Sequence, residues 1–153
     1  MGNASGYAEI SAFAHATEDL DKVKASVLRV LPEALSARVR FCESTMRGHH
    51  DNLIVELRVE LYSRADAYQA LQAILAGISS LDERALEDGL SKHLDERNRL
   101  YLRLDKQKAF QGEVVLASVD AISFTFRLPS CPKSLRQLKE VLATYADPGR
   151  KGF

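Results

Sequence analysis

The sequence has few cysteines, no long apolar run and no excess of either charge. These features bear on the redox environment, on membrane insertion and on the attraction of polyanions. Its 153 residues contain two cysteines, Cys42 and Cys131, which form no CxxC or other ligand spacing. A reducing cytoplasm is therefore the simpler environment. Because no apolar run could span a bilayer, we expect no membrane segment. The opening residues, MGNASGYAEI, lack the basic and apolar regions of a signal peptide.

The formal charge is zero, with 21 lysines and arginines against 21 aspartates and glutamates. A neutral chain cannot rely on its overall field to attract a polyanion. Any interaction with nucleic acid must therefore depend on a local patch of basic residues.

Motifs of catalysis and cofactor binding are absent from the sequence as well. There is no G-x-S-x-G elbow and no placed Cys–His pair, and no Gly-rich phosphate loop. Cys42, on a predicted strand, is most simply a small buried hydrophobe. We therefore expect no enzyme and no cofactor.

The four histidines raise the question of a metal site. His49 and His50 are adjacent, so in an extended backbone they point in opposite directions, while zinc requires three or four convergent ligands. We expect no metal site, although a metal-dependent nuclease that uses His49, His50 and Asp51 stays open as a weaker alternative.

Hydrophobic periodicity predicts an α+β fold. The length indicates one domain over residues 1–153, with flexible ends at 1–6 and 147–153. We predict strands at 7–15, 39–46, 53–62, 100–104, 113–119 and 122–128. Helices are predicted after Thr17, Ser63, Ser80 and Ser134, each a possible capping residue. The order is β-α-β-β-α-α-β-β-β-α. Most strands have one apolar and one polar face, which favours a mostly antiparallel sheet with helices packed on one face.

The stretch LYLRLDKQKAFQG at 100–112 is the most informative one for function. Its leucines alternate with Tyr101 and Arg103, and the alternation ends at a polar, basic tip over residues 105–108. If the strands at 100–104 and 122–128 share a sheet, Arg103 and Arg127 lie on its non-core face. Tyr101 would join them as a flat surface on which a base could stack. A second loop offers donors suited to phosphate or 2′-hydroxyl groups from Arg47, His49 and His50.

Three segments of the chain resemble a known family. AEISAFAHATEDLDKV at 8–23, RGHHDN at 47–52 and LYLRLDKQKAFQG at 100–112 are similar to an archaeal family of RNA-binding proteins that are described as candidate exosome subunits. The fold of that family is likened to the double-stranded-RNA-binding domain or to a ribosomal-protein α+β sandwich. The resemblance runs from about Tyr7 to Leu128. It implies RNA binding without catalysis, in RNA processing or degradation, and it carries Arg103, Lys106 and Gln107 over as RNA-binding residues.

The chain departs from the family pattern at the histidine loop. There the pattern continues Gly-Asn-Pro-Ile, whereas this sequence has Asp51-Asn52-Leu53-Ile54. An acid beside His50 would weaken the attraction of phosphate to that loop.

The leading hypothesis is a cytoplasmic, non-catalytic protein that binds structured RNA, with an exosome or other RNA-processing protein as a further partner. The expected RNA-binding residues are Arg103, Lys106, Gln107, Lys108, Arg127, Tyr101, Arg47, His49 and His50. The alternative is a protein-interaction subunit or homodimer that uses an open sheet face bearing Tyr101 and Val114.

Overall fold

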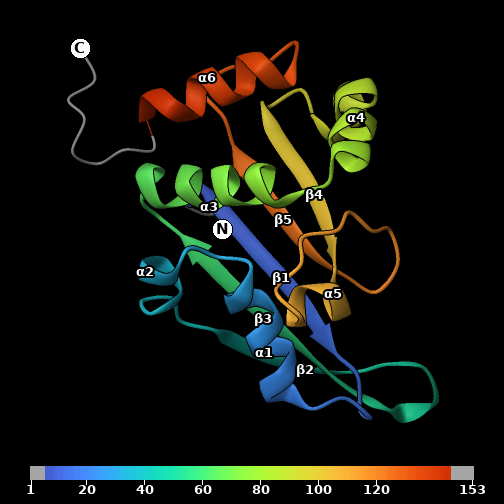
Figure 1. Cartoon of the computed structure of the whole chain (residues 1–153). Coiled ribbons are helices and arrows are strands. Elements are labelled where there is room, and N and C mark those ends of the chain that lie inside the picture. Colours follow the sequence, from blue (N-terminus) through green and yellow to red (C-terminus); the bar gives the residue numbers. More distant parts are fainter. Residues whose placement is uncertain (1–5, 146–153) are drawn as a thin grey trace.

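Alternating apolar and polar residues form a five-stranded antiparallel sheet in this computed structural model, which describes residues 6–145. The strands are β1 (Ala8–Ala14), β2 (Cys42–Arg47), β3 (Leu53–Leu61), β4 (Arg99–Asp105) and β5 (Ala121–Arg127). Their order across the sheet is β2-β3-β1-β5-β4, so β2 and β4 form the two edges. Figure 1 shows the helices gathered on one face of this sheet. The predicted α+β architecture is confirmed.

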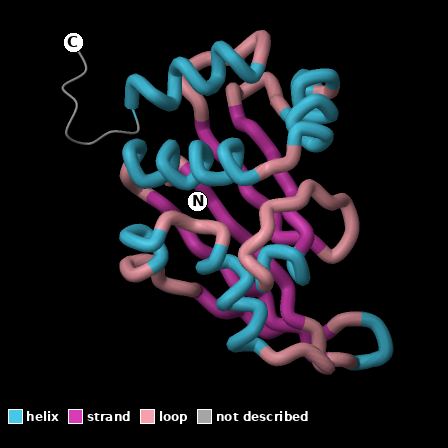
Figure 2. Tube along the Cα trace, viewed as in Figure 1, coloured by secondary structure: helices cyan, strands magenta, loops and turns pink. Residues whose placement is uncertain are grey.

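The helices cover the apolar face of the sheet in two groups. They are α1 (Leu20–Arg29), α2 (Glu33–Ser36), α3 (Arg64–Gly77), α4 (Ser80–Asp88), α5 (Lys106–Phe110) and α6 (Leu135–Tyr145). Helices α1, α2 and α5 lie near the lower end of the sheet in Figure 2, and α3, α4 and α6 lie near its upper end. None of the helices within residues 6–145 has both the length and the apolar character that a membrane span requires.

The core lies between this face of the sheet and the helices. The inward-facing apolar residues of β1, β4 and β5 are at most 4% exposed. The rings of Phe124 and Phe126 are stacked, with centroids 6.1 Å apart. Because side chains alternate across a strand, burying these residues places Tyr101, Arg103 and Arg127 on the opposite, open face. That part of the prediction is confirmed.

Side-chain caps set where α1, α3 and α4 begin, and they do so at α5 and α6 as well. Ser63 was expected to start α3, and its side chain accepts a hydrogen bond from the Asp66 backbone N–H. Two expected caps were wrong by one or two residues. Asp19 rather than Thr17 caps α1, and Ser79 rather than Ser80 caps α4. Each observed cap supplies a side-chain oxygen to a backbone N–H that has no partner within the helix.

The basic tip predicted at 105–108 is instead the start of a helix. The Asp105 carboxylate accepts a 2.8 Å hydrogen bond from the Lys108 backbone N–H, and this cap starts α5 directly at the end of β4. The predicted strand at 113–119 is also wrong, because only a single bridge, between Leu104 and Leu116, pairs this segment with β4. Its Leu116 N–H is bonded instead to the Asp82 carboxylate of α4.

Other differences from the predictions are local. The short helix α2 was not predicted, and β2 begins at Cys42 rather than at Val39. Cys42 is exposed, not buried, because β2 is an edge strand with all six residues exposed. Val114 packs against the core beside Gly77 and so is not on the open face. The flexibility expected at 1–5 and 147–153 concerns residues outside the described range. Gly6 donates from its backbone to the Glu60 carboxylate.

Candidate functional site

Three arginines lie on the open face of β4 and β5. Arg99 pairs with Arg127 across the two strands, and Arg103 pairs with Ser123 four residues along. Tyr101 and Thr125 lie between these two pairs. Four residues of strand separate the two ends by ~13 Å. We call this surface, formed by Arg99, Tyr101, Arg103, Ser123, Thr125 and Arg127, the arginine face.

Two of the arginines carry charge that no carboxylate neutralises within residues 6–145. The Arg127 guanidinium lies 4.2 Å from the centre of the Tyr7 ring. Arg103 makes one long contact, 3.4 Å from its Nη1 to the Ser118 carbonyl. A guanidinium has five N–H donors, so most donors of both arginines remain available to an anion.

Arg99 and Tyr101 are held by Asp95, which lies just before β4. The carboxylate of Asp95 accepts bonds of 2.9 Å from Arg99 Nε and 2.8 Å from the Tyr101 hydroxyl. Desolvation alone would raise the pKa of Asp95, but hydrogen bonds from Arg99, Tyr101 and Arg97 outweigh it and lower that pKa. Asp95 is therefore charged at neutral pH and fixes the Tyr101 ring, which is 39% exposed, on the arginine face.

On the neighbouring strands β1 and β3 the open face is acidic rather than basic. Their outward residues include three glutamates and one arginine. Arg58 is paired with Glu9 at 3.0 Å and with Glu56 at 3.2 Å. Glu60 lies across from Glu9 in the register. The open face therefore has a basic half on β4–β5 and an acidic half on β1–β3.

Lys106 was expected to contact phosphate, but it is buried. Its side chain is 4% exposed, and its Nζ donates to the Phe13 carbonyl at 2.8 Å. The same Nζ lies 3.0 Å from the Glu18 carboxylate and 2.9 Å from that of Asp120. With all of its donors engaged inside the protein, Lys106 cannot contact a phosphate directly.

His15 completes this arrangement, which we call the Lys106 cluster (His15, Glu18, Lys106 and Asp120). Single atoms of His15, Glu18 and Asp120 lie within 4.8 Å of one another, close enough to hold a metal ion. The Lys106 ammonium already supplies positive charge between the two carboxylates. Its hydrogen bond to Asp120 is the main reason that the pKa of Asp120 is lowered. The four side chains of the cluster therefore form an ion network with one another, in which Lys106 is the cation.

Gln107 and Lys108 are exposed on α5. This helix packs against α1, on the side of the sheet that carries the helices. Gln107 lines a hollow there with Glu18, Lys22 and Phe110. The two residues therefore do not share a surface with Arg103 and Arg127.

The histidine loop lies at the other edge of the sheet. Arg47 ends β2, and its guanidinium is 2.5 Å from the Asp51 carboxylate. His49 and His50 are exposed in the short turn that follows, where His50 and Asp51 have φ angles of 60° and 65°. Figure 1 shows this loop at the same end of the sheet as α5. Four strand spacings separate β2 from β4, which amounts to ~19 Å.

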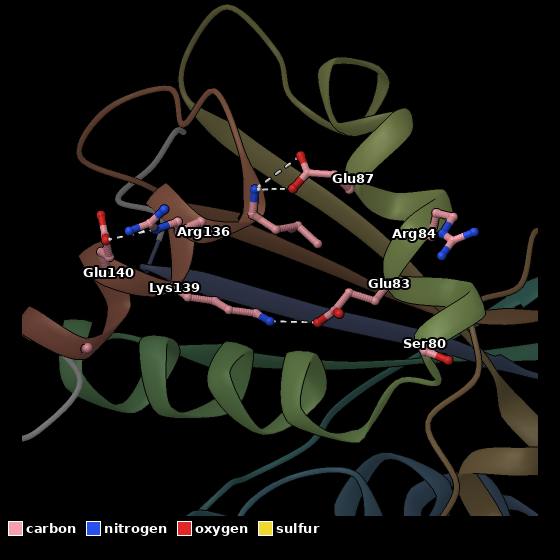
Figure 3. A pocket seen from close by; sticks show the side chains of 9 residues that line it. Ser80, Glu83, Arg84, Glu87, Arg136, Lys139 and Glu140 are labelled. Carbon is pink, nitrogen blue, oxygen red and sulfur yellow. Dashed lines mark hydrogen bonds and ion pairs between the residues drawn. The ribbon is translucent and has the colours of Figure 1, made fainter.

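A groove of about 730 Å³ lies between α4 and α6. Figure 3 shows that its charges are mostly joined across or along the helices. Lys139 is 2.6 Å from Glu83, and Arg136 is 3.6 Å from Glu140. The Glu87 carboxylate accepts from the Leu135 backbone N–H. The contacts of Glu83 and Glu87 tie α4 to α6, so the groove has a structural role in the packing of the two helices.

The nine residues expected to bind RNA therefore divide among three places. The arginine face has Tyr101, Arg103 and Arg127; α5 has Lys106, Gln107 and Lys108; and the histidine loop has Arg47, His49 and His50. Sequence reasoning missed Phe13, an aromatic residue that is 39% exposed near Arg103. The available signal was a phenylalanine on the polar side of an alternating strand.

Comparison with known proteins decides the family. The sequence model of a family described as RNA binding matches residues 7–128, which is most of the chain. The chain belongs to this family. The segments that carried the resemblance all lie within the matched residues.

Individual family relatives are archaeal. The chain is 30% identical to the RNA-binding protein PAB1135 of Pyrococcus abyssi over 125 residues, which cover 80% of this chain and 81% of that protein. Among solved structures, it is similar to protein SSO0741 from Sulfolobus solfataricus, with a TM-score of 0.73 and 26% identity over 89% of this chain and 97% of the other. Protein AF2318 from Archaeoglobus fulgidus gives a TM-score of 0.69 and 29% identity, with 92% and 96% covered.

Proposed function

We propose that this protein is a non-catalytic RNA-binding protein that holds structured RNA on its arginine face. The observation that carries the proposal is the pair Arg103 and Arg127. Both are on the open face of the sheet, and neither has a carboxylate partner among the described residues. Membership of a family described as RNA binding supports the same reading.

The chemistry of the arginine face suits a sugar–phosphate backbone. Arginine presents a planar fork of donors that matches phosphate oxygens. Thr125 and Ser123 add hydroxyl groups between the arginines, and Tyr101 adds a half-exposed ring. Contacts of this kind fix the position of RNA with little dependence on its sequence.

A double substitution tests this proposal. In Arg103→Ala/Arg127→Ala we expect affinity for an RNA hairpin to fall about tenfold for each arginine, since hydrogen bonds to charged groups contribute about 1.5–3 kcal/mol and 1.4 kcal/mol is tenfold. The slope of log affinity against log salt should also fall by about 1.4–1.8, at about 0.7–0.9 per phosphate contact. Fluorescence anisotropy over a range of salt concentrations measures both.

The matched control is Arg84→Ala/Arg136→Ala, which removes the same charge from exposed positions on α4 and α6. This control should retain wild-type affinity. If both double variants bind RNA as well as the wild type, the arginine face is not the interface. RNA should also stay intact when it is incubated with the protein and manganese or zinc; cleavage would instead support a nuclease.

We further propose that the protein acts in the cytoplasm in RNA processing or degradation, with the exosome as a partner. The support is the resemblance of residues 8–23, 47–52 and 100–112 to the family described in this way. Copurification of exosome subunits with the tagged protein, before and after ribonuclease treatment, distinguishes a direct protein contact from one that RNA bridges.

A second candidate function, a protein-interaction module or homodimer, is favoured by strand β2. All six of its residues are exposed, so this edge offers unpaired backbone groups to another strand. A complex formed in this way should be insensitive to salt. Gel filtration at low and high salt, run beside the RNA titration, separates the two functions.

A further inference from the structure

A hollow lies at the end of the arginine face. It has a volume of about 440 Å³ and is bounded by the end of β1, the start of β5, and the loop at 118–120. This volume is within the range of about 300–1,000 Å³ that is typical of small-molecule sites. Arg103 takes part in both surfaces, so the hollow continues the arginine face.

The apolar part of the hollow is exposed to solvent. Phe13 points out of the polar face of β1 and is 39% exposed, and Val119 on the loop is 80% exposed. In the register of the sheet, Phe13 lies across from Glu56 and so has no aromatic neighbour there. An exposed ring at the edge of a basic surface is a platform on which a nucleobase can stack.

The polar part of the hollow supplies donors. Arg103 and Ser123 are directly opposite one another on β4 and β5. Arg103 uses only one long bond, to the Ser118 carbonyl, so it can turn other N–H groups toward a phosphate.

The hollow also contains an acidic residue, which is paired with Lys106 and His15. Asp120 also lines the hollow, but its carboxylate is 2.9 Å from Lys106 and 3.4 Å from His15. Both of these partners belong to the Lys106 cluster. The Lys106 ammonium, which Asp120 shares with Glu18, offsets part of this negative charge, and Arg103 supplies the cation that a phosphate in the hollow would contact.

We propose that this hollow binds one unpaired nucleotide of an RNA that lies on the arginine face, with its base stacked on Phe13 and its phosphate held by Arg103. The inference rests on the proposed function and adds to it the kind of RNA that is bound: a structured RNA with a bulged or terminal unpaired nucleotide. A protein side chain bound in the hollow would contact only Arg103. An RNA backbone that leaves the hollow along the arginine face can contact both Arg103 and Arg127.

The test compares two RNA hairpins that differ by one bulged adenosine in the stem. The wild-type protein should bind the bulged hairpin about tenfold more tightly, because stacking of one base on an aromatic side chain contributes about 5- to 150-fold in affinity. Phe13→Ala should remove this preference and leave affinity for the fully paired hairpin unchanged. Phe13→Leu, which keeps an apolar side chain, should remove it as well.

The matched control is Tyr62→Ala, which deletes an aromatic ring that is 67% exposed and lies outside the hollow. This variant should keep the tenfold preference. Thermal melts followed by circular dichroism confirm that each variant is folded, and Phe13→Leu carries the test if Phe13→Ala does not fold.

The outcomes separate the inference from the proposed function. If the wild type binds both hairpins equally, or if Phe13→Ala keeps the preference, the hollow is not a nucleotide site. In that case salt-dependent binding through Arg103 and Arg127 still supports the proposed function. If neither hairpin binds to the wild type at low salt, both the function and the inference are overturned.

Discussion

The arginine face and the Lys106 cluster both contain basic residues that come from the stretch at 100–112, yet the two behave in opposite ways. Arg103 has no carboxylate partner among residues 6–145 and is exposed on the open face. Lys106, three residues later, is 4% exposed and bonded to two carboxylates and a carbonyl. A basic residue is available to an anion only where the fold has not already placed a carboxylate beside it. The same local excess of positive charge thus leaves Arg103 available for the RNA binding that we propose, and ties Lys106 into the fold.

The largest effect that we expect from this comparison is on stability. Lys106→Met should lower the free energy of unfolding by about 2 kcal/mol, less than the 3–5 kcal/mol typical of a broken buried ion pair, because Glu18 and Asp120 are partly exposed. Urea denaturation measures this change. Lys108→Met is the matched control on the same helix, and as an exposed site it should change stability by less than about 0.5 kcal/mol. Equal effects of the two substitutions would show that the cluster is not stabilising.

A smaller effect should appear in the pH dependence of stability. The pKa of Asp120 is lowered in the folded protein, chiefly by the hydrogen bond from Lys106. A carboxylate with a lowered pKa stabilises the fold above its unfolded pKa of ~3.9, and this contribution is lost as pH falls through the folded value. The difference in stability between wild type and Lys106→Met should therefore shrink as pH falls from about 5 toward 2. Urea titrations across that range measure it, and a constant difference would argue against the assignment.

The smallest expected effect concerns RNA affinity at α5. Because Lys108 lies on the helical side of the sheet, Lys108→Ala should weaken binding of an RNA hairpin less than about threefold, compared with about tenfold for Arg103→Ala. Anisotropy titrations of the two single variants at one salt concentration give the ratio. A larger loss in Lys108→Ala would extend the interface around the edge of the sheet and would remove the contrast between the two regions.

Much of the arginine face could be predicted because the pattern that defines it is local. Strand alternation places residues i and i+2 on one face, so Leu100, Leu102 and Leu104 fixed the side on which Tyr101 and Arg103 lie. The same logic applied to Arg127 on β5. The sequence alone could not show that Asp95 would hold Tyr101, since that contact follows from a turn before β4.

The burial and ion pairing of Lys106 could not be predicted in the same way. Its partners Phe13 and Glu18 are 93 and 88 residues away in the sequence. Although Asp105 is a common helix-capping residue, the end of β4 looked like a polar tip because no apolar stripe marks so short a helix. The hollow beside Phe13 likewise depends on the loop at 118–120, which packing brings to the end of β1.

The amino-acid sequence by itself determined the faces of the strands, the α+β class and the family, because each depends on periodicity or motifs within short segments. Only the tertiary structure decided which cations remain free, since that depends on which distant carboxylates and carbonyls the packed helices bring beside them. The sequence specifies the charged residues, but the folded structure determines which of them are paired with an opposite charge.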